Sequence, residues 1–188
     1  MKMSVTVDGF VGNLNGGNDW MFKSSDETSR AASLKQSYDA SLIIMGRKSF
    51  DSMASYWITA TIPFATPMNE IPKAVFTEKG YKGFNAGDNQ SAAAASWANA
   101  KIYDGDLVET IKQLKAEDGK PILAIAGAGF MRNLVATGLI DEYHLNMHPV
   151  LLGQGQPVFN SILQPVHLKL MDVKSFPGGI ISQVYQPA

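Results

Sequence analysis

Short apolar runs alternate with amphipathic and polar stretches along most of the chain. We predict strands where apolar and β-branched residues follow one another, and helices where apolar residues recur every three or four positions. The predicted strands cover residues 3–7, 10–11, 41–45, 73–77, 121–126 and 142–147. The predicted helices cover about residues 24–38, 47–54, 106–117 and 130–136, with a turn or two of helix at 91–98.

The order of these elements predicts an α/β fold. A strand followed by a helix, repeated about four times, favours a mostly parallel sheet with right-handed crossover connections. Two final strands, near residues 166–176 and 180–185, flank Pro177-Gly178-Gly179 and are typical of an antiparallel hairpin. We therefore expect a mixed sheet with the hairpin at one edge, in a single domain over residues 1–188.

Two local signals refine this picture. The S-x-x-E spacing of Ser24 and Glu27 predicts a capping box that opens the polar helix ending near Tyr38. Glycines and asparagines at 13–19 predict a loop, and Pro63 and Pro67 predict that most of residues 56–70 is irregular.

Composition excludes several classes of function. Sixteen Lys and Arg against 17 Asp and Glu give a net charge of -1, which argues against nucleic-acid binding by bulk charge. The absence of cysteine excludes disulfides, thiolate metal sites and a cysteine nucleophile. His144 and His148 lack a carboxylate pattern that would complete a metal site, so we expect none. No apolar run suits a membrane span and no signal peptide opens the chain, so we expect a cytoplasmic protein without a membrane partner.

One strand end carries groups that suit a phosphate. Ligands of open α/β sheets bind beyond the carboxyl ends of the strands. Gly46, Arg47, Lys48 and Ser49 follow the strand at 41–45 and open a helix, so they offer close backbone approach, free N–H groups, two cations and a hydroxyl. The alternative is a surface Arg-Lys pair at a helix start.

A second strand end is rich in glycine. Residues 127–130 (G-A-G-F) follow the strand at 121–126 and have the G-x-G spacing of dinucleotide-binding loops. A full fingerprint is missing, because Arg132 stands where the third glycine belongs and no acidic residue follows about 20 positions later. The alternative is a turn where glycine allows tight packing of helix and strand.

Acidic residues gather near the first strand and the first helix: Asp8, Asp19, Asp26 and Glu27. Turn and helix-start roles account for Asp8 and Asp26. A carboxylate held in a pocket could instead bind an N-heterocycle through paired hydrogen bonds, or direct protonation.

Four segments together resemble the dihydrofolate reductase superfamily and, within it, the branch of the riboflavin-pathway reductase domain (RibD C-terminal-domain-like). They are residues 4–11 (S-V-T-V-D-G-F-V) with Asp19 and Trp20, residues 44–50 (I-M-G-R-K-S-F), residues 127–130, and residues 138–142 (G-L-I-D-E) followed by 149–155 (P-V-L-L-G-Q-G). The resemblance spans nearly the whole chain in order and is weakest over 56–101.

The resemblance implies a mixed, mostly parallel sheet of about eight strands with flanking helices, NADPH as cofactor and often a homodimer. The residues implied to hold the adenosine 2′-phosphate and pyrophosphate are Gly46, Arg47, Lys48 and Ser49. Thr77 would line the adenosine side. The residues implied to lie along the pyrophosphate and nicotinamide are Gly127, Ala128, Gly129 and Phe130.

On the substrate side, similarity to dihydrofolate reductases implies Trp20 in the first loop and Asp26 at the first helix, with Glu27 the next acid. Similarity to the riboflavin-pathway enzymes implies Asp8. We expect an NADPH-dependent reductase that transfers hydride to a C=N or C=O of a small heterocycle, dihydrofolate-like or riboflavin-precursor-like. Asp26, or a water that it orients, would donate the proton, and Trp20 would help close the loop. The alternative is a non-catalytic nucleotide-binding or scaffold homodimer of the same fold.

Overall fold

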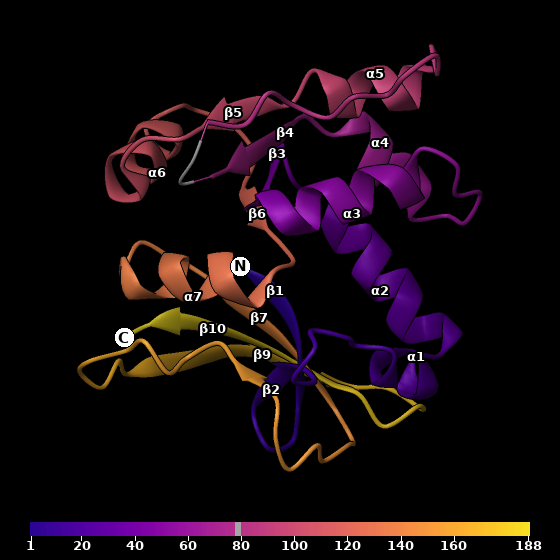
Figure 1. The fold of residues 1–188 in the computed structure, drawn as a ribbon. Helices are drawn as coiled ribbons and strands as arrows, with labels where there is room; N and C mark the ends of the chain where they lie inside the picture. The colour runs from indigo at the N-terminus through magenta and orange to yellow at the C-terminus, as the bar shows by residue number, and fades with distance from the viewer. Residues whose placement is uncertain (78–79) are drawn as a thin grey trace. The chain divides into compact units, whose positions relative to one another are not determined.

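A computed structural model describes residues 1–77 and 80–188. The contacts between these residues group them into two compact units. The first unit comprises residues 1–32 and 128–188, and the second comprises residues 33–127. Each unit contains a four-stranded sheet of its own (Figure 1).

The first unit is built on a mixed sheet with the strand order β1-β7-β10-β9. β1 runs parallel to β7, whereas β10 runs antiparallel to β7 and β9, so the predicted C-terminal hairpin at a sheet edge is confirmed. A short antiparallel ladder joins β2 and β8. The elements are β1 (Lys2–Thr6), β2 (Phe10–Gly12), α1 (Trp20–Ser24), α7 (Ala128–Ala136), β7 (Tyr143–His148), β8 (Gln156–Pro157), β9 (Leu168–Ser175) and β10 (Ile181–Pro187). α2 (Glu27–Tyr38) runs from the first unit into the second.

The second unit contains an all-parallel sheet with the order β5-β4-β3-β6. Its elements are β3 (Leu42–Gly46), α3 (Arg47–Trp57), α4 (Ala65–Glu70), β4 (Lys73–Phe76), α5 (Ala92–Ala98), β5 (Lys101–Tyr103), α6 (Leu107–Lys115) and β6 (Ile122–Ala124). The core contains Ile43 and Met45 of β3 with Phe50 of α3 and Trp97 of α5. β3 is a near-continuous apolar run, as is typical of a parallel strand with both faces covered, and it pairs in parallel with β4 and β6.

The predicted sheet of about eight strands differs from the observed arrangement. The described strands form two four-stranded sheets and a two-stranded ladder. β1 pairs with β7, and β6 pairs with β3, so the parallel pairs assort into separate sheets. A single domain over the whole chain stays a prediction.

The capping box predicted from Ser24 and Glu27 is wrong. Ser24 ends the short helix α1, which the sequence pattern did not reveal, and the Ser25 hydroxyl donates to the Met21 carbonyl at 2.7 Å. Asp26 caps α2 instead: the Ser29 N–H donates to Asp26 Oδ1 at 2.8 Å, and the Asp26 N–H donates to the Ser29 hydroxyl at 3.0 Å. The same reciprocal arrangement is therefore formed two residues further along the chain.

In the second unit, α4 and β5 were not predicted. α4 lies in the stretch expected to be mostly irregular, where Pro67 falls in the first turn and its missing N–H removes no helical hydrogen bond. β5 has three residues and two of them are exposed, so it carries almost no apolar pattern. Among the helices in the described part of the chain, none is long and apolar enough to cross a membrane.

Candidate functional site

The predicted phosphate-binding residues of the second unit lie at, or shortly after, the carboxyl ends of neighbouring parallel strands. Gly46, the last residue of β3, pairs with Phe76, and Thr77 comes directly after Phe76. On the other side of β3, Ile44 pairs with Ala124, and the Ile125 N–H donates to the Ile44 carbonyl at 3.2 Å just before Gly127. The strand order reverses at β3, because β4 and β5 lie on one side and β6 on the other. Such a reversal is where open α/β sheets place their ligands.

The N-terminus of α3 leaves backbone donors at this strand end. Gly46 is the extended residue before the helix, with φ -79° and ψ 152°, and has no side chain to cap it. The first N–H groups of a helix have no partner within the helix and carry its positive dipole end. Arg47 and Lys48 are exposed on the first turn, while Phe50 is fully buried and anchors the helix to the core. The arrangement suits an anion.

Arg47 is held by two neighbours. Its Nε lies 3.7 Å from Asp51 Oδ2, one turn along α3. Its guanidinium carbon lies 4.9 Å from the centre of the Tyr81 ring. The Tyr81 hydroxyl in turn donates to Asp51 Oδ1. Sequence inspection singled out the cation but not the two residues that position it.

The turn between β6 and α7 has an unusual backbone. Ala126 and Gly127 have φ of 58° and 79°, so two successive residues adopt the left-handed conformation, which alanine rarely does. Ala128, Gly129 and Phe130 then form the first turn of α7, which belongs to the first unit. A Cβ added at Gly129 would meet no atom within 4 Å. Tight packing therefore does not explain the glycine at this position.

Asp8 accepts hydrogen bonds from a loop of the first unit that is distant in the sequence. Its Oδ1 accepts from the Thr6 hydroxyl at 2.5 Å, and its Oδ2 accepts from the N–H groups of Leu152 and Gly153 at 3.0 and 2.7 Å. The Thr6 hydrogen bond is the largest of the contacts that lower the pKa of Asp8. This geometry agrees with the turn role, and substrate binding by Asp8 stays a prediction.

Asp26 has a similar structural role. Beyond the Ser29 N–H, its carboxylate accepts from the Thr28 hydroxyl at 2.6 Å and from the Gly178 N–H of the C-terminal hairpin at 2.7 Å. The Thr28 hydrogen bond, followed by the two backbone N–H groups, lowers the pKa of Asp26 to about 2. A carboxyl group with this pKa is ionised at neutral pH, so the geometry does not favour the predicted proton donation. Glu27 is exposed in the first turn of α2.

Trp20 lies at the start of α1, beside a buried histidine. Its ring meets the His148 ring edge-on, with centroids 5.2 Å apart. In the part of the chain that the structure describes, the Trp20 Nε1 atom is buried and has no hydrogen-bond partner. A buried donor without a partner is rare, and a ligand that accepts from it would explain it.

His148 is a polar residue that sequence inspection considered only as a metal ligand. It is 2% exposed, and both ring nitrogens face serine hydroxyls: Nδ1 lies 2.7 Å from Ser24 Oγ, and Nε2 lies 3.1 Å from Ser4 Oγ. Burial lowers its pKa, which favours the neutral ring. A neutral imidazole donates at one nitrogen and accepts at the other, so the ring can move a proton between the two hydroxyls. A lone histidine in a strand carries no spacing signal that would have revealed this.

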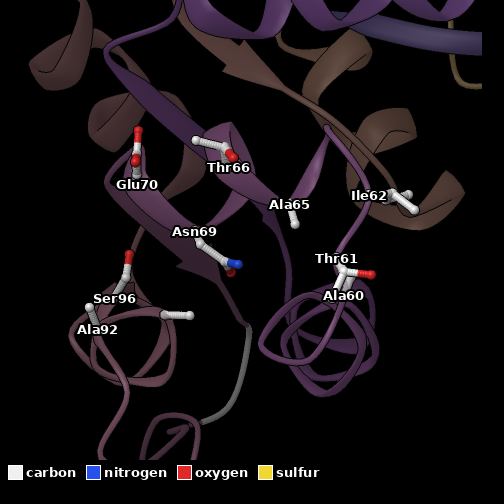
Figure 2. A pocket seen from close by; sticks show the side chains of 10 residues that line it. Ala60, Thr61, Ile62, Ala65, Thr66, Asn69, Glu70, Ala92 and Ser96 are labelled. Carbon is white, nitrogen blue, oxygen red and sulfur yellow. The ribbon is translucent and has the colours of Figure 1, made fainter.

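A surface pocket of about 590 Å³ in the second unit is lined by residues of α4 and α5 and of the segment before α4 (Figure 2). Asn69 and Glu70 line it from α4, and Ser96 from α5. The Asn69 side chain accepts from Trp97 Nε1 at 2.8 Å and donates to the Trp57 carbonyl at 2.9 Å. The polar atoms of the Asn69 side chain therefore bond to neighbouring protein groups. None of the predicted site residues lines this pocket.

The parallel sheet of the second unit and the antiparallel C-terminal strands of the first together define a mixed α/β fold. Over residues 1–182 the chain matches the RibD C-terminal domain. The chain belongs to the RibD C-terminal domain family, and the resemblance found in the sequence is confirmed.

Three relatives illustrate the match. The protein YyaP of Bacillus subtilis (strain 168), whose name gives no activity, is 32% identical over 195 residues, which cover 98% of this chain and 92% of YyaP. The structure of RibD from Acinetobacter baumannii (form 2) is similar with a TM-score of 0.73 and 18% identity. A deaminase/5-amino-6-(5-phosphoribosylamino)uracil reductase from Thermotoga maritima is similar with a TM-score of 0.65 and 16% identity. All of this chain matches both solved structures, but it spans only 56% and 55% of their lengths.

Proposed function

We propose that the chain is an NADPH-dependent reductase of the riboflavin-pathway type, which delivers hydride to a C=N or C=O bond of a small heterocycle. One observation carries the proposal: Arg47 and the N-terminus of α3 lie at the strand-order reversal of a parallel sheet, in a chain of the RibD C-terminal domain family. The reductase named from Thermotoga maritima acts on a phosphoribosylamino-uracil, and that compound is the first substrate to test.

The residues present fit the cofactor. Arg47 and Lys48 would neutralise the adenosine 2′-phosphate, with the Ser49 hydroxyl and the N–H groups of α3 as donors. Thr77, after the neighbouring strand, would line the adenosine. The left-handed turn at Ala126 and Gly127 would allow close approach to the pyrophosphate. When bound, NADPH would supply the hydride from its nicotinamide ring.

On the substrate side, the Trp20 N–H would donate to a heterocycle, since it is buried without a protein partner in the described residues.

Two residues are candidates for the proton source. Asp26 is the predicted one, but its oxygens are occupied and its pKa is about 2. His148, with a serine hydroxyl on each nitrogen, has the chemistry of a relay. We therefore expect His148→Gln to lower turnover more than Asp26→Asn in the same assay, and the reverse order would return the proton source to Asp26.

The edge strand β9 supports a homodimer as part of the proposal. Leu168, Leu170 and Val173 of this strand are 39%, 49% and 54% exposed. Tyr185 pairs with Leu170 and Val184 with Asp172, so Met171 is the extra residue of a bulge that leaves these three side chains on one face. Sedimentation equilibrium of wild-type protein and Leu170→Lys tests this: a monomer in both would exclude the dimer.

The deciding experiment is a titration of tryptophan fluorescence with NADPH and NADH in parallel, on wild type and Arg47→Ala. We expect wild type to prefer NADPH, and Arg47→Ala to lose that preference while NADH binding changes little. Equal losses for both cofactors would refute the 2′-phosphate role of Arg47, and no binding of either would refute the reductase. NADPH binding without oxidation across pyrimidine, pterin and carbonyl substrates would support the non-catalytic alternative.

A further inference from the structure

Arg47, Asp51 and Tyr81 form a closed ring of interactions in the second unit. The Asp51 carboxylate bridges two donors: Oδ2 faces Arg47 Nε at 3.7 Å, and Oδ1 accepts from the Tyr81 hydroxyl. The guanidinium lies over the same Tyr81 ring, with its carbon 4.9 Å from the ring centre. Each of the three side chains therefore contacts both others.

Packing of Tyr81 against the core fixes the position of this three-residue cluster. The Tyr81 ring meets the Phe50 ring edge-on, with centroids 6.2 Å apart, and Phe50 is fully buried. Burial and the hydrogen bond to Asp51 both raise the pKa of Tyr81, so the phenol keeps its proton and remains a donor at any physiological pH. The position of Tyr81 is thus set by the core, and Tyr81 in turn sets the position of Asp51.

The contacts leave the anion-binding end of Arg47 available. Asp51 faces Nε, and the aromatic ring covers one face of the guanidinium. The two terminal nitrogens are the pair that binds a phosphate in a fork. A free arginine side chain has many rotamers, and the ordering cost of binding is removed when the protein has already selected one.

We propose that Asp51 and Tyr81 are positioning residues that hold the Arg47 guanidinium in place for a phosphomonoester dianion, the adenosine 2′-phosphate, and thereby set the preference for NADPH over NADH. This inference rests on the proposed function. The two residues need not touch the cofactor, because they act through the orientation of Arg47.

The test compares four variants by the ratio of the dissociation constants for NADPH and NADH. Tyr81→Leu removes the ring and the hydroxyl, Tyr81→Phe keeps the ring, and Asp51→Asn removes the carboxylate charge. Tyr56→Leu is the matched control, because Tyr56 is a tyrosine of α3, the helix that carries Arg47 and Asp51. Its ring contacts the Trp57 ring, with centroids 4.8 Å apart. We expect Tyr81→Leu to weaken NADPH about tenfold with NADH nearly unchanged, Tyr81→Phe and Asp51→Asn to weaken NADPH by a smaller factor, and Tyr56→Leu to change neither.

The outcomes separate the inference from the proposed function. If wild type shows no NADPH preference, the proposed function fails. If Arg47→Ala abolishes the preference but Tyr81→Leu and Tyr81→Phe both keep it, the proposed function stands and the positioning role is refuted. Equal weakening of both cofactors by Tyr81→Phe, which preserves the packing on Phe50, would also refute it, since a purely structural effect does not distinguish a 2′-phosphate.

Discussion

Gly178, in the turn of the C-terminal hairpin, lies against the segment that joins α1 to α2. A Cβ at this position would lie 1.9 Å from the Ser24 carbonyl oxygen, 2.9 Å from its carbon and 3.0 Å from Asp26 Oδ2. Two of these atoms are backbone, and Asp26 is held by the cap of α2, so neither neighbour can rotate away as a flexible side chain would. We therefore expect Gly178→Ala to push the hairpin away and break the hydrogen bond from the Gly178 N–H to Asp26.

The cost follows from overpacking. Inserting a methyl group into a well-packed site costs about 1–3 kcal/mol. With a urea m-value of about 2 kcal/mol/M, the unfolding midpoint should fall by about 1 M. The assay is equilibrium urea unfolding followed by circular dichroism.

Gly105→Ala is the control, because a Cβ at Gly105 would meet no atom within 4 Å. This variant should have a midpoint close to that of wild type. Equal midpoints for Gly178→Ala and wild type would refute the close approach of the hairpin to Ser24 and Asp26.

Two further predictions concern pH. The pKa of Asp26 is about 2 in the folded chain against an ordinary value of 3.8, so its contribution to stability is present above pH 3.8 and is lost as the pH falls toward 2. Urea midpoints of wild type and Asp26→Asn should therefore differ at neutral pH and converge near pH 2, and a constant difference would contradict this. Lys73, 2% exposed and hydrogen-bonded to the Ile71 carbonyl and Ser96 hydroxyl, has its pKa lowered by burial from 10.5 to about 8. Between pH 8 and 10.5 the unfolded chain binds more protons at Lys73 than the folded chain does. The urea midpoint of wild type, relative to that of Lys73→Met, should therefore rise over this range. Midpoints that change in parallel with pH would exclude the lowered pKa of Lys73.

The local pattern was sufficient for much of the fold. The apolar run of β3 predicts a buried parallel strand, and Pro177-Gly178-Gly179 predicts the final hairpin; both are observed. The pattern of apolar runs and glycines also predicted that Gly46 and Gly127 mark strand ends. This signal is local: a glycine after an apolar run favours the end of a strand whatever the tertiary structure is. Elements with little apolar pattern, such as β5, were missed, because an apolar run is the signal from which a strand is predicted.

The partners of the polar side chains were decided by the tertiary structure. Asp8 accepts from backbone groups 144 and 145 residues away, and Asp26 from one 152 residues away. His148 lies against Ser24 and Ser4 from the opposite end of the chain, and Tyr81 meets Arg47 across 34 positions of numbering. Secondary structure depends on neighbours in the sequence, so residue periodicity predicts it. A hydrogen bond or ring contact depends on which atoms packing brings within a few ångströms, and a single sequence does not encode that locally.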